Sequence, residues 1–294
     1  MSLFFRTGAI ALGVCLAAIA GSANAQSVLG YGSGKLLLTG GVSQIEGQAG
    51  GGLTPWAVIG GYESDDQIGG NVYATDVNTT DYDVRSIGAL VGFYNRIEFS
   101  YSRQSFNTQD VGTVLSLGQD FTINQDTLGV KVRLFGDAVL DQDHWWPQVS
   151  IGAQFKKNDK GWLVTALGAR RSRDADYFVS ATKLYLAQGI LLNATVRQTR
   201  ANQYGILGFG GIDDKRHTQL EGSAAYLINR KLAIGAEVRT KPDNLAVAKE
   251  GAAVDAFVAY APTKNISITV AYADLGNIVT RRQTGLYASL QVGF

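Results

Sequence analysis

The chain has 294 residues, with 26 basic and 25 acidic side chains, two histidines and a formal net charge of +1. This balance argues against a nucleic-acid-binding protein, which would carry a basic excess. Glycine is abundant, with 36 residues, and no apolar run after residue 26 is long enough for a transmembrane helix. The composition therefore leaves β-rich folds, either in solution or in a membrane.

The N-terminus has the features of a secretory signal peptide. Residues 1–7 carry one positive charge, Arg6, and residues 8–20 form a short apolar stretch. An Ala-x-Ala cleavage site then places the cut between Ala25 and Gln26. We expect residues 1–25 to be removed and residues 26–294 to form one β-barrel domain. The only cysteine, Cys15, leaves with the signal peptide, so the mature chain has no thiol for a disulfide or a metal site.

From residue 35 onward the chain repeats segments of alternating apolar and polar residues. The alternation is clearest at 128–134, 232–239 and 266–272, and it is typical of β-strands with two different faces. Short turns separate alternate segments, at 95–96, 137–143, 188–189, 229–230 and 262–264. Longer polar segments lie between them, at 107–125, 157–176, 201–216, 241–251 and 276–282. Short periplasmic turns and long outer loops are typical of outer-membrane β-barrels.

The pattern predicts an all-β, up-and-down antiparallel barrel of about fourteen strands, with twelve or sixteen as alternatives. It begins with a hairpin of strands at 35–46 and 54–62, followed by a strand at 68–76. An even strand number keeps both chain ends in the periplasm, as bacterial barrels require. The apolar segment 162–169 is assigned to a loop. A strand there would change the count.

The last segment alternates strictly and ends on an aromatic residue. Its apolar members are Leu286, Ala288, Leu290, Val292 and Phe294. The pattern resembles the C-terminal signal by which the barrel assembly machinery recognises outer-membrane barrels, so we expect that machinery and outer-membrane lipids as partners. An amphipathic last strand pairs with the first and removes both sheet edges. Aromatic residues near the short turns predict an interfacial girdle, namely Phe93, Tyr94, Trp145, Trp146, Tyr226 and Tyr260.

The polar face of the predicted strands would line the lumen. It carries these charged residues: Glu98, Lys131, Arg133, Lys156, Lys183, Arg197, Glu221, Glu237, Arg239 and Asp255. Buried charges must be paired or hydrated. They either line a water-filled channel, whose basic strip would favour anions, or pair across the lumen into a closed barrel. Small inward residues, namely Gly129, Gly152 and Ala271, favour an open lumen, whereas a dense network of ion pairs would favour a closed one.

Several segments resemble a proteobacterial family of predicted outer-membrane proteins of unassigned function. They are Gly-Gly-Leu-Thr-Pro-Trp (51–56), Ala-Thr-Lys-Leu-Tyr (181–185), Ala-Asn-Gln-Tyr-Gly-Ile-Leu-Gly-Phe-Gly-Gly (201–211), Lys-Pro-Asp-Asn-Leu (241–245) and the ending at 285–294. The resemblance covers most of the mature chain. It implies the barrel and its location in the outer membrane of a Gram-negative bacterium, and it supplies no catalytic or ligand residues.

Catalytic chemistry has little support in the sequence. His144 and His217 fall at opposite ends of the predicted barrel, so they cannot share a metal site, and a lipid-hydrolysing pair of His217 with Ser223 would need a loop to fold back. We expect no cofactor and no enzymatic activity. The function expected first is a passive or substrate-selective channel for small solutes. A closed barrel that works through its long loops is the alternative, and a lipid-modifying enzyme is a weaker one.

Overall fold

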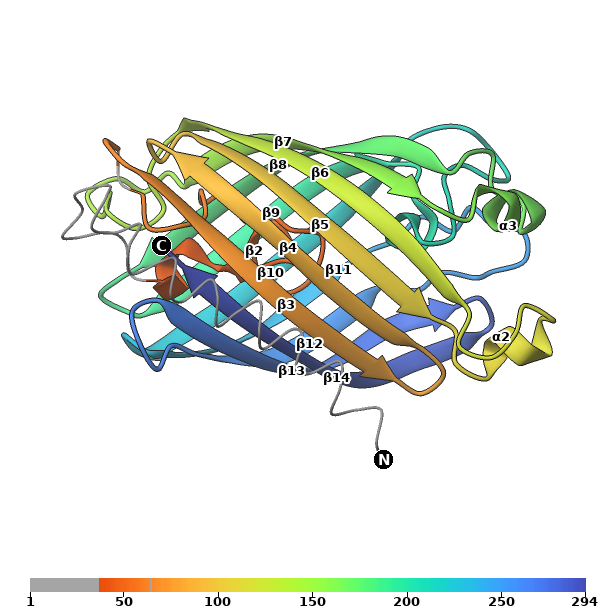
Figure 1. Cartoon of the computed structure of the whole chain (residues 1–294). Coiled ribbons are helices and arrows are strands. Elements are labelled where there is room, and N and C mark those ends of the chain that lie inside the picture. The colour runs from red at the N-terminus through yellow and green to blue at the C-terminus, as the bar shows by residue number, and fades with distance from the viewer. Residues whose placement is uncertain (1–36, 64) are drawn as a thin grey trace.

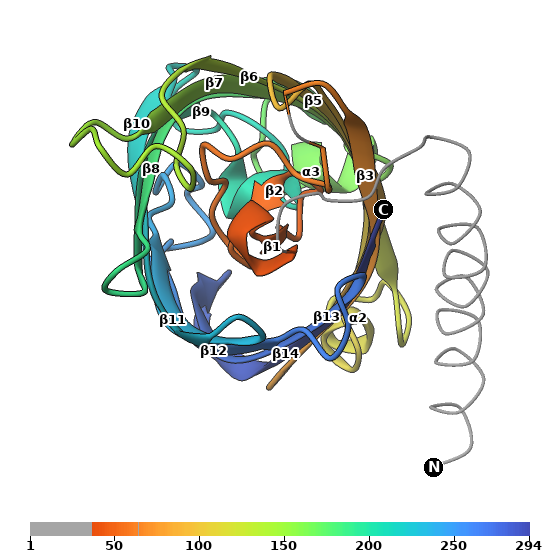
Figure 2. The same ribbon diagram turned by 90° about the vertical axis from the view of Figure 1, so that its left-hand side faces the viewer.

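The computed structural model describes residues 37–63 and 65–294 as a closed antiparallel β-barrel with a segment of chain inside it (Figure 1, Figure 2). In these residues the wall has twelve strands, each paired with its neighbours in sequence. Their bounds are β3 (Ile68–Thr79), β4 (Asp83–Phe93), β5 (Ile97–Asn107), β6 (Thr122–Phe135), β7 (Gln148–Asn158), β8 (Arg173–Tyr185), β9 (Ile190–Thr199), β10 (His217–Asn229), β11 (Leu232–Arg239), β12 (Ala253–Tyr260), β13 (Ile266–Ile278) and β14 (Arg281–Gly293). The predicted all-β barrel is confirmed, with the smallest of the expected strand numbers in its wall.

The barrel closes where the last strand meets the first strand of the wall. β14 pairs with β3 from Gly285↔Thr79 to Gly293↔Asn71. The pairing continues one step further, because Phe294 donates its N–H to the Gly70 carbonyl at 2.9 Å and accepts the Gly70 N–H at 2.8 Å. The final aromatic residue therefore belongs to the seam that removes both sheet edges.

The outer surface of the wall is apolar and its inner surface is largely polar. On β13, Ile268, Val270 and Tyr272 are 42%, 49% and 60% exposed, whereas Thr269 and Ala271 between them are buried. On β14, Leu286 and Ala288 are likewise exposed, while Val292 near its end is buried. A soluble sheet would bury its aliphatic face. Large apolar side chains exposed on strand after strand form the band that a membrane barrel presents to lipid.

The two ends of the barrel differ. Short turns gather at the end that holds the C-terminus, and the longer loops with α2 (Val111–Val114) and α3 (Gly161–Ala166) lie at the other end (Figure 1). The segment 162–169 lies in the loop between β7 and β8, as the loop assignment requires, and most of it is helical. Within the described residues, no helix is long and apolar enough to cross a membrane.

The expected first hairpin, with strands at 35–46 and 54–62, is not part of the wall. The structure instead places 37–63 inside the lumen, as η1 (Leu37–Gly40), β1 (Val42–Ser43), β2 (Ala49–Gly50) and irregular chain (Figure 2). We call residues 37–63 the plug. As wall strands these segments would turn Gln44 and Glu46 toward the same face as Val42, so one face would mix charge with aliphatic groups. Inside the lumen the polar side chains find partners instead.

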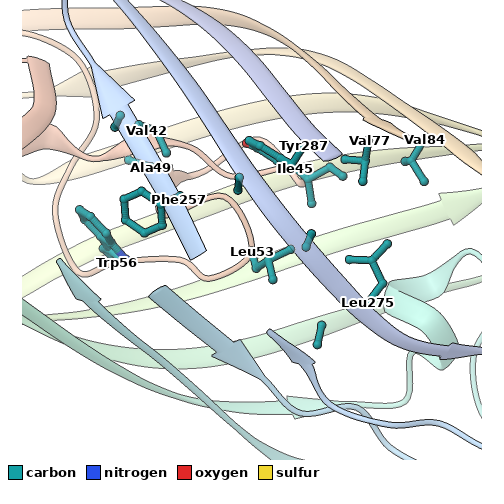
Figure 3. Packing of buried hydrophobic residues seen from close by; sticks show 14 of the residues in the cluster. Val42, Ile45, Ala49, Leu53, Trp56, Val77, Val84, Phe257, Leu275 and Tyr287 are labelled. Atoms are coloured by element: carbon teal, nitrogen blue, oxygen red, sulfur yellow. The ribbon is translucent and has the colours of Figure 1, made fainter. Parts of the chain in front are cut away.

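The apolar side chains of the plug pack against inward-facing residues of the wall. Figure 3 shows Val42, Ile45 and Leu53 of the plug in one buried cluster with Phe257 and Tyr287 of the wall. The expected signal peptide, including the cleavage site at Ala25 and Gln26, lies outside the described residues.

Candidate functional site: the plugged lumen

The plug carries a small hairpin whose tip presents one carboxylate. β1 and β2 pair through Val42↔Gly50 and Ser43↔Ala49. The turn between them is tied by the Gln44 N–H to the Gln48 carbonyl at 2.9 Å and by the Gly47 N–H to the Gln44 carbonyl at 2.8 Å. Gly47 has φ +100°, a backbone conformation that favours glycine. This turn holds Glu46 at the tip of the hairpin.

Glu46 completes a ring of buried charges that we call the charge belt. Its members are Glu46, Lys156, Asp176, Arg197, Glu221 and Arg239, and each side chain is at most 3% exposed. Glu46 accepts from Lys156 and from Arg239 Nη1, the latter at 2.7 Å. Burial by itself raises the pKa of Glu46, but Arg239 and Lys156 outweigh it and hold the pKa well below its ordinary value. The carboxylate therefore stays ionised in the lumen.

The wall members of the charge belt also pair with one another. Lys156 donates to Asp176 at 2.6 Å, and Arg197 donates to Glu221. Arg239 Nε lies 3.4 Å from Glu221, and Arg197 Nη1 lies 3.5 Å from Asp176. The belt thus contains three cations and three carboxylates. The wall supplies all of them except Glu46, so the wall residues of the belt comprise three cations and two carboxylates.

A second anchor of the plug is Glu237 on β11. Its carboxylate accepts the Leu53 N–H at 2.7 Å and the Thr54 hydroxyl at 2.6 Å. The Ser223 hydroxyl lies 2.5 Å from the Thr54 hydroxyl and accepts the Trp56 indole N–H at 2.9 Å. A Cβ added at Gly51 would meet the Glu237 carboxylate, so a larger residue would push this part of the plug away.

A third anchor joins the plug backbone to β5 and β6. Glu98 accepts the N–H groups of Ala49 at 3.2 Å and Gly60 at 2.9 Å. Lys131 lies 3.0 Å from Glu98 and donates to the Ala49 carbonyl at 3.0 Å. Polar groups of β7 to β9 also donate to the carbonyls of the plug, for example Gln148 to Ala57 at 2.6 Å. Besides its apolar packing, the plug is therefore held by many hydrogen bonds and ion pairs, which water could replace.

The loop between β9 and β10 folds into the long-loop end of the lumen. It contains η2 (Asn202–Gly205), and the ring of Tyr204 lies 4.2 Å from the Arg239 guanidinium carbon. Gln203 accepts from Lys241 at 2.7 Å, and Lys241 also pairs with Glu250 at 2.8 Å. We call the loops 200–216 and 240–252 the lid, because they cover the tip of the plug.

The space between plug, lid and β13 is small. An enclosed cavity of about 30 Å³ is lined by apolar groups that include Ile45, Leu53 and Leu275. That volume holds roughly one or two water molecules. At this point of the lumen, the described residues leave almost no open space.

The structure buries every charged residue that the sequence assigned to the lumen, and it divides them into groups. Lys156, Arg197, Glu221 and Arg239 meet in the charge belt, and Glu98 with Lys131 and Glu237 anchor the plug. Asp255 lies beside Glu237 in the sheet register. The remaining two lie toward the short-turn end: Arg133 pairs with Asp137 at 3.2 Å, and Lys183 donates to the His144 carbonyl at 2.9 Å.

The sequence reasoning missed four residues that matter here: Glu46, Thr54, Asp176 and Tyr204. Glu46 and Thr54 were assigned to wall strands, and Asp176 was assigned to the end of a loop, although β8 begins three residues before it, at Arg173. Its spacing from Phe178 and Ser180, which are also buried, is the signal that identifies it as inward-facing.

The two histidines do not form a hydrolytic site with Ser223. The His217 ring lies 3.1 Å from Asp213, whereas Ser223 is bonded to the plug inside the lumen. His144 pairs with Asp141 at the short-turn end, at 2.7 Å. Among residues 37–63 and 65–294, no three acidic, histidine or cysteine side chains gather as metal ligands.

Comparison with known proteins supports the fold and identifies a family. The KdgM porin is 11% identical, with a TM-score of 0.50, over 76% of this chain and 99% of that one. The COG4313 outer membrane channel from Pseudomonas putida F1 is 10% identical, with a TM-score of 0.49, over 79% and 96%. No curated protein sequence matches significantly. The likeness to the KdgM porin shows that the two chains share a β-barrel fold. Residues 39–291 match the family described as "Protein of unknown function (DUF3034)", and because this match spans most of the chain, the protein belongs to the DUF3034 family.

Proposed function

We propose that this protein is a plug-gated channel for small solutes in the outer membrane of a Gram-negative bacterium. The observation that carries the proposal is the way in which the plug is held. Glu98, Glu237 and the charge belt bind it through polar contacts, and water or a polar solute can replace such contacts. A lumen closed permanently would gain more from apolar packing than from buried charges.

A weak preference for anions follows from the charge of the belt, the part of the lumen nearest the long loops, once the plug leaves. Without Glu46, the belt keeps Lys156, Arg197 and Arg239 against Asp176 and Glu221. One uncompensated positive charge at a narrow point of the lumen attracts anions and repels cations. The preference should weaken as ionic strength rises, because salt screens the field.

The route to the membrane is part of the same proposal. The signal peptide at 1–25 would export the chain, and the barrel assembly machinery would insert it through the strand that ends at Phe294. The KdgM porin is also known in complex with disordered oligogalacturonate. That complex supports the proposal that a barrel of this fold admits an acidic solute.

A closed barrel that works through its loops is the second candidate, and one observation favours it. The belt with Glu46 in place is neutral and fully buried, so it stabilises the barrel as it stands. In that case the loops with α2 and α3 would be the working surface.

Weakening one anchor of the plug separates the two candidates. Ser223→Ala removes the acceptor of the Trp56 indole and a partner of Thr54, which stabilise only the plugged state. In single-channel recordings from a planar bilayer, we expect brief steps from the unaltered protein and an open fraction about tenfold higher in the variant, since neutral hydrogen bonds contribute about 0.5–1.5 kcal/mol each.

Ser289→Ala is the matched control. Ser289 bonds Thr75 at 2.8 Å within the wall, so its loss should leave the open fraction unchanged. Silence from both variants, with the barrel shown to be folded, would favour the closed barrel.

A further inference from the structure

We infer that the Glu46 carboxylate occupies a binding site for a carboxylate group of the transported solute, and that the solute opens the channel by displacing Glu46. This inference rests on the proposed channel function and adds the chemical class of its solute.

The geometry around Glu46 is that of a site built for a carboxylate. Lys156 and Arg239 donate to its two different oxygens. The Tyr204 ring covers the Arg239 guanidinium at 4.2 Å and limits where it can move, while the Tyr204 carbonyl accepts from Lys156 at 3.2 Å. Charge-assisted hydrogen bonds from two fixed cations are the usual means of recognising a carboxylate.

Glu46 and its two cation partners come from parts of the chain that differ in how firmly backbone pairing holds them. Lys156 and Arg239 stand on β7 and β11, where continuous pairing with β6, β8, β10 and β12 fixes them. Glu46 stands on a five-residue turn at the tip of a hairpin with only two paired positions. The acidic partner can therefore leave while the basic partners stay.

The site also lies where an incoming solute would reach the plug. It is between the tip of the plug and Tyr204 of the lid, at the long-loop end of the lumen. A solute that passes the lid meets the charge belt before the anchors at Glu98 and Glu237. Because Glu46 and a solute carboxylate compete for the same two cations, binding of one releases the other.

Binding in detergent solution tests the site without requiring current. With the full chain, titration calorimetry would compare glucuronate with glucose, which differ in that one carries a carboxylate. We expect Glu46→Ala to bind glucuronate at least tenfold more tightly than the unaltered protein and not to bind glucose. Adding Lys156→Gln should abolish the gain, since a charge-assisted hydrogen bond is worth about a factor of ten or more in affinity.

Gln48→Ala is the matched control, because Gln48 lies on the same turn and its side chain contacts Val130 and Gln154 but not Glu46. It should show no gain for glucuronate. Equal affinities of Glu46→Ala for the two sugars, or an affinity for glucuronate no higher than that of the unaltered protein, would overturn the inference.

A second measurement does not depend on an altered charge belt. Thr54→Cys provides the only thiol of the mature chain at a position that is fully buried in the plugged state. Glucuronate should accelerate its reaction with a maleimide severalfold, and glucose should not. Equal rates with both sugars would contradict displacement of the plug. A protein that binds glucuronate without conducting would refute the channel and keep the site, and a conducting protein without binding would do the reverse.

Discussion

Deletion of residues 41–60 is expected to convert a channel that is closed most of the time into one that is open continuously, with a mean current at least tenfold higher. The deletion removes the hairpin and the segment that contacts Glu237, Ser223 and Glu98. It leaves all strands from β3 to β14, and therefore the closed hydrogen-bonded wall. Eight-stranded barrels are filled by their own side chains and sixteen-stranded ones are open, so a twelve-stranded barrel depends on its plug.

The deleted protein must be shown to be folded before its current is interpreted. Retention of β-structure and a heat-dependent shift in electrophoretic mobility would establish this. In a salt gradient, the reversal potential of the open form should indicate anion preference, because the wall keeps three belt cations against two carboxylates. A deleted protein that is folded but conducts no current would contradict the expected continuous opening.

Reversing one charge of the belt is expected to reverse the ion preference of that open form. Arg197→Glu in the deleted protein leaves Lys156 and Arg239 against three carboxylates, so the reversal potential should move toward cations. In the full chain the same change removes one of the two cations that pair with Glu221 and places like charges together. Breaking a buried ion pair costs about 3–5 kcal/mol, and the plugged protein should unfold at a clearly lower temperature.

Two further arginine variants act as controls for this experiment. Arg103→Glu makes the same charge change outside the lumen, where Arg103 pairs with Asp126 and is half-exposed, and it should leave the reversal potential unchanged. Arg133→Glu, near the short turns, should have a smaller effect than Arg197→Glu, because Arg133 lies outside the belt. A reversal potential that does not move in Arg197→Glu would show that the belt does not control ion preference.

The barrel could be predicted from the sequence because lipid and lumen impose opposite demands on successive residues. In 128–134 the apolar residues Leu128 and Leu134 are exposed, while Lys131 and Arg133 are buried. This alternation repeats in every wall strand, so it identified the strands and the inward charges together. The last strand, ending at Phe294, was recognisable for the same reason.

The plug could not be predicted in this way, for two physical reasons. Its paired segments are only two residues long, so alternation carries no information there. Counting strands by parity also fails, since a hairpin adds two strands and leaves the direction of every later strand unchanged. Apolar residues such as Val42 and Trp56 look like lipid-facing residues in the sequence, although they pack inside the lumen.

Small inward residues were read as a sign of empty space, and the structure fills that space. A Cβ on Gly129 would meet Ser100 of β5 and Gln48 of the plug, and one on Gly152 would meet the Phe178 ring of β8. A missing side chain in one strand thus marks the approach of another group. Only contacts between distant segments reveal which group that is.

The most direct test of the plug as a gate is a reversible cross-link between plug and wall. The hydroxyl oxygens of Thr54 and Ser223 are 2.5 Å apart, so Thr54→Cys with Ser223→Cys places two sulfurs close enough for a disulfide. The only other cysteine of the chain is Cys15, in the expected signal peptide. Single-channel recording of this double variant should show no steps when it is oxidised, and steps should return within the same membrane after a reductant is added. Equal conductance in the oxidised and reduced forms would mean that the plug does not gate the lumen.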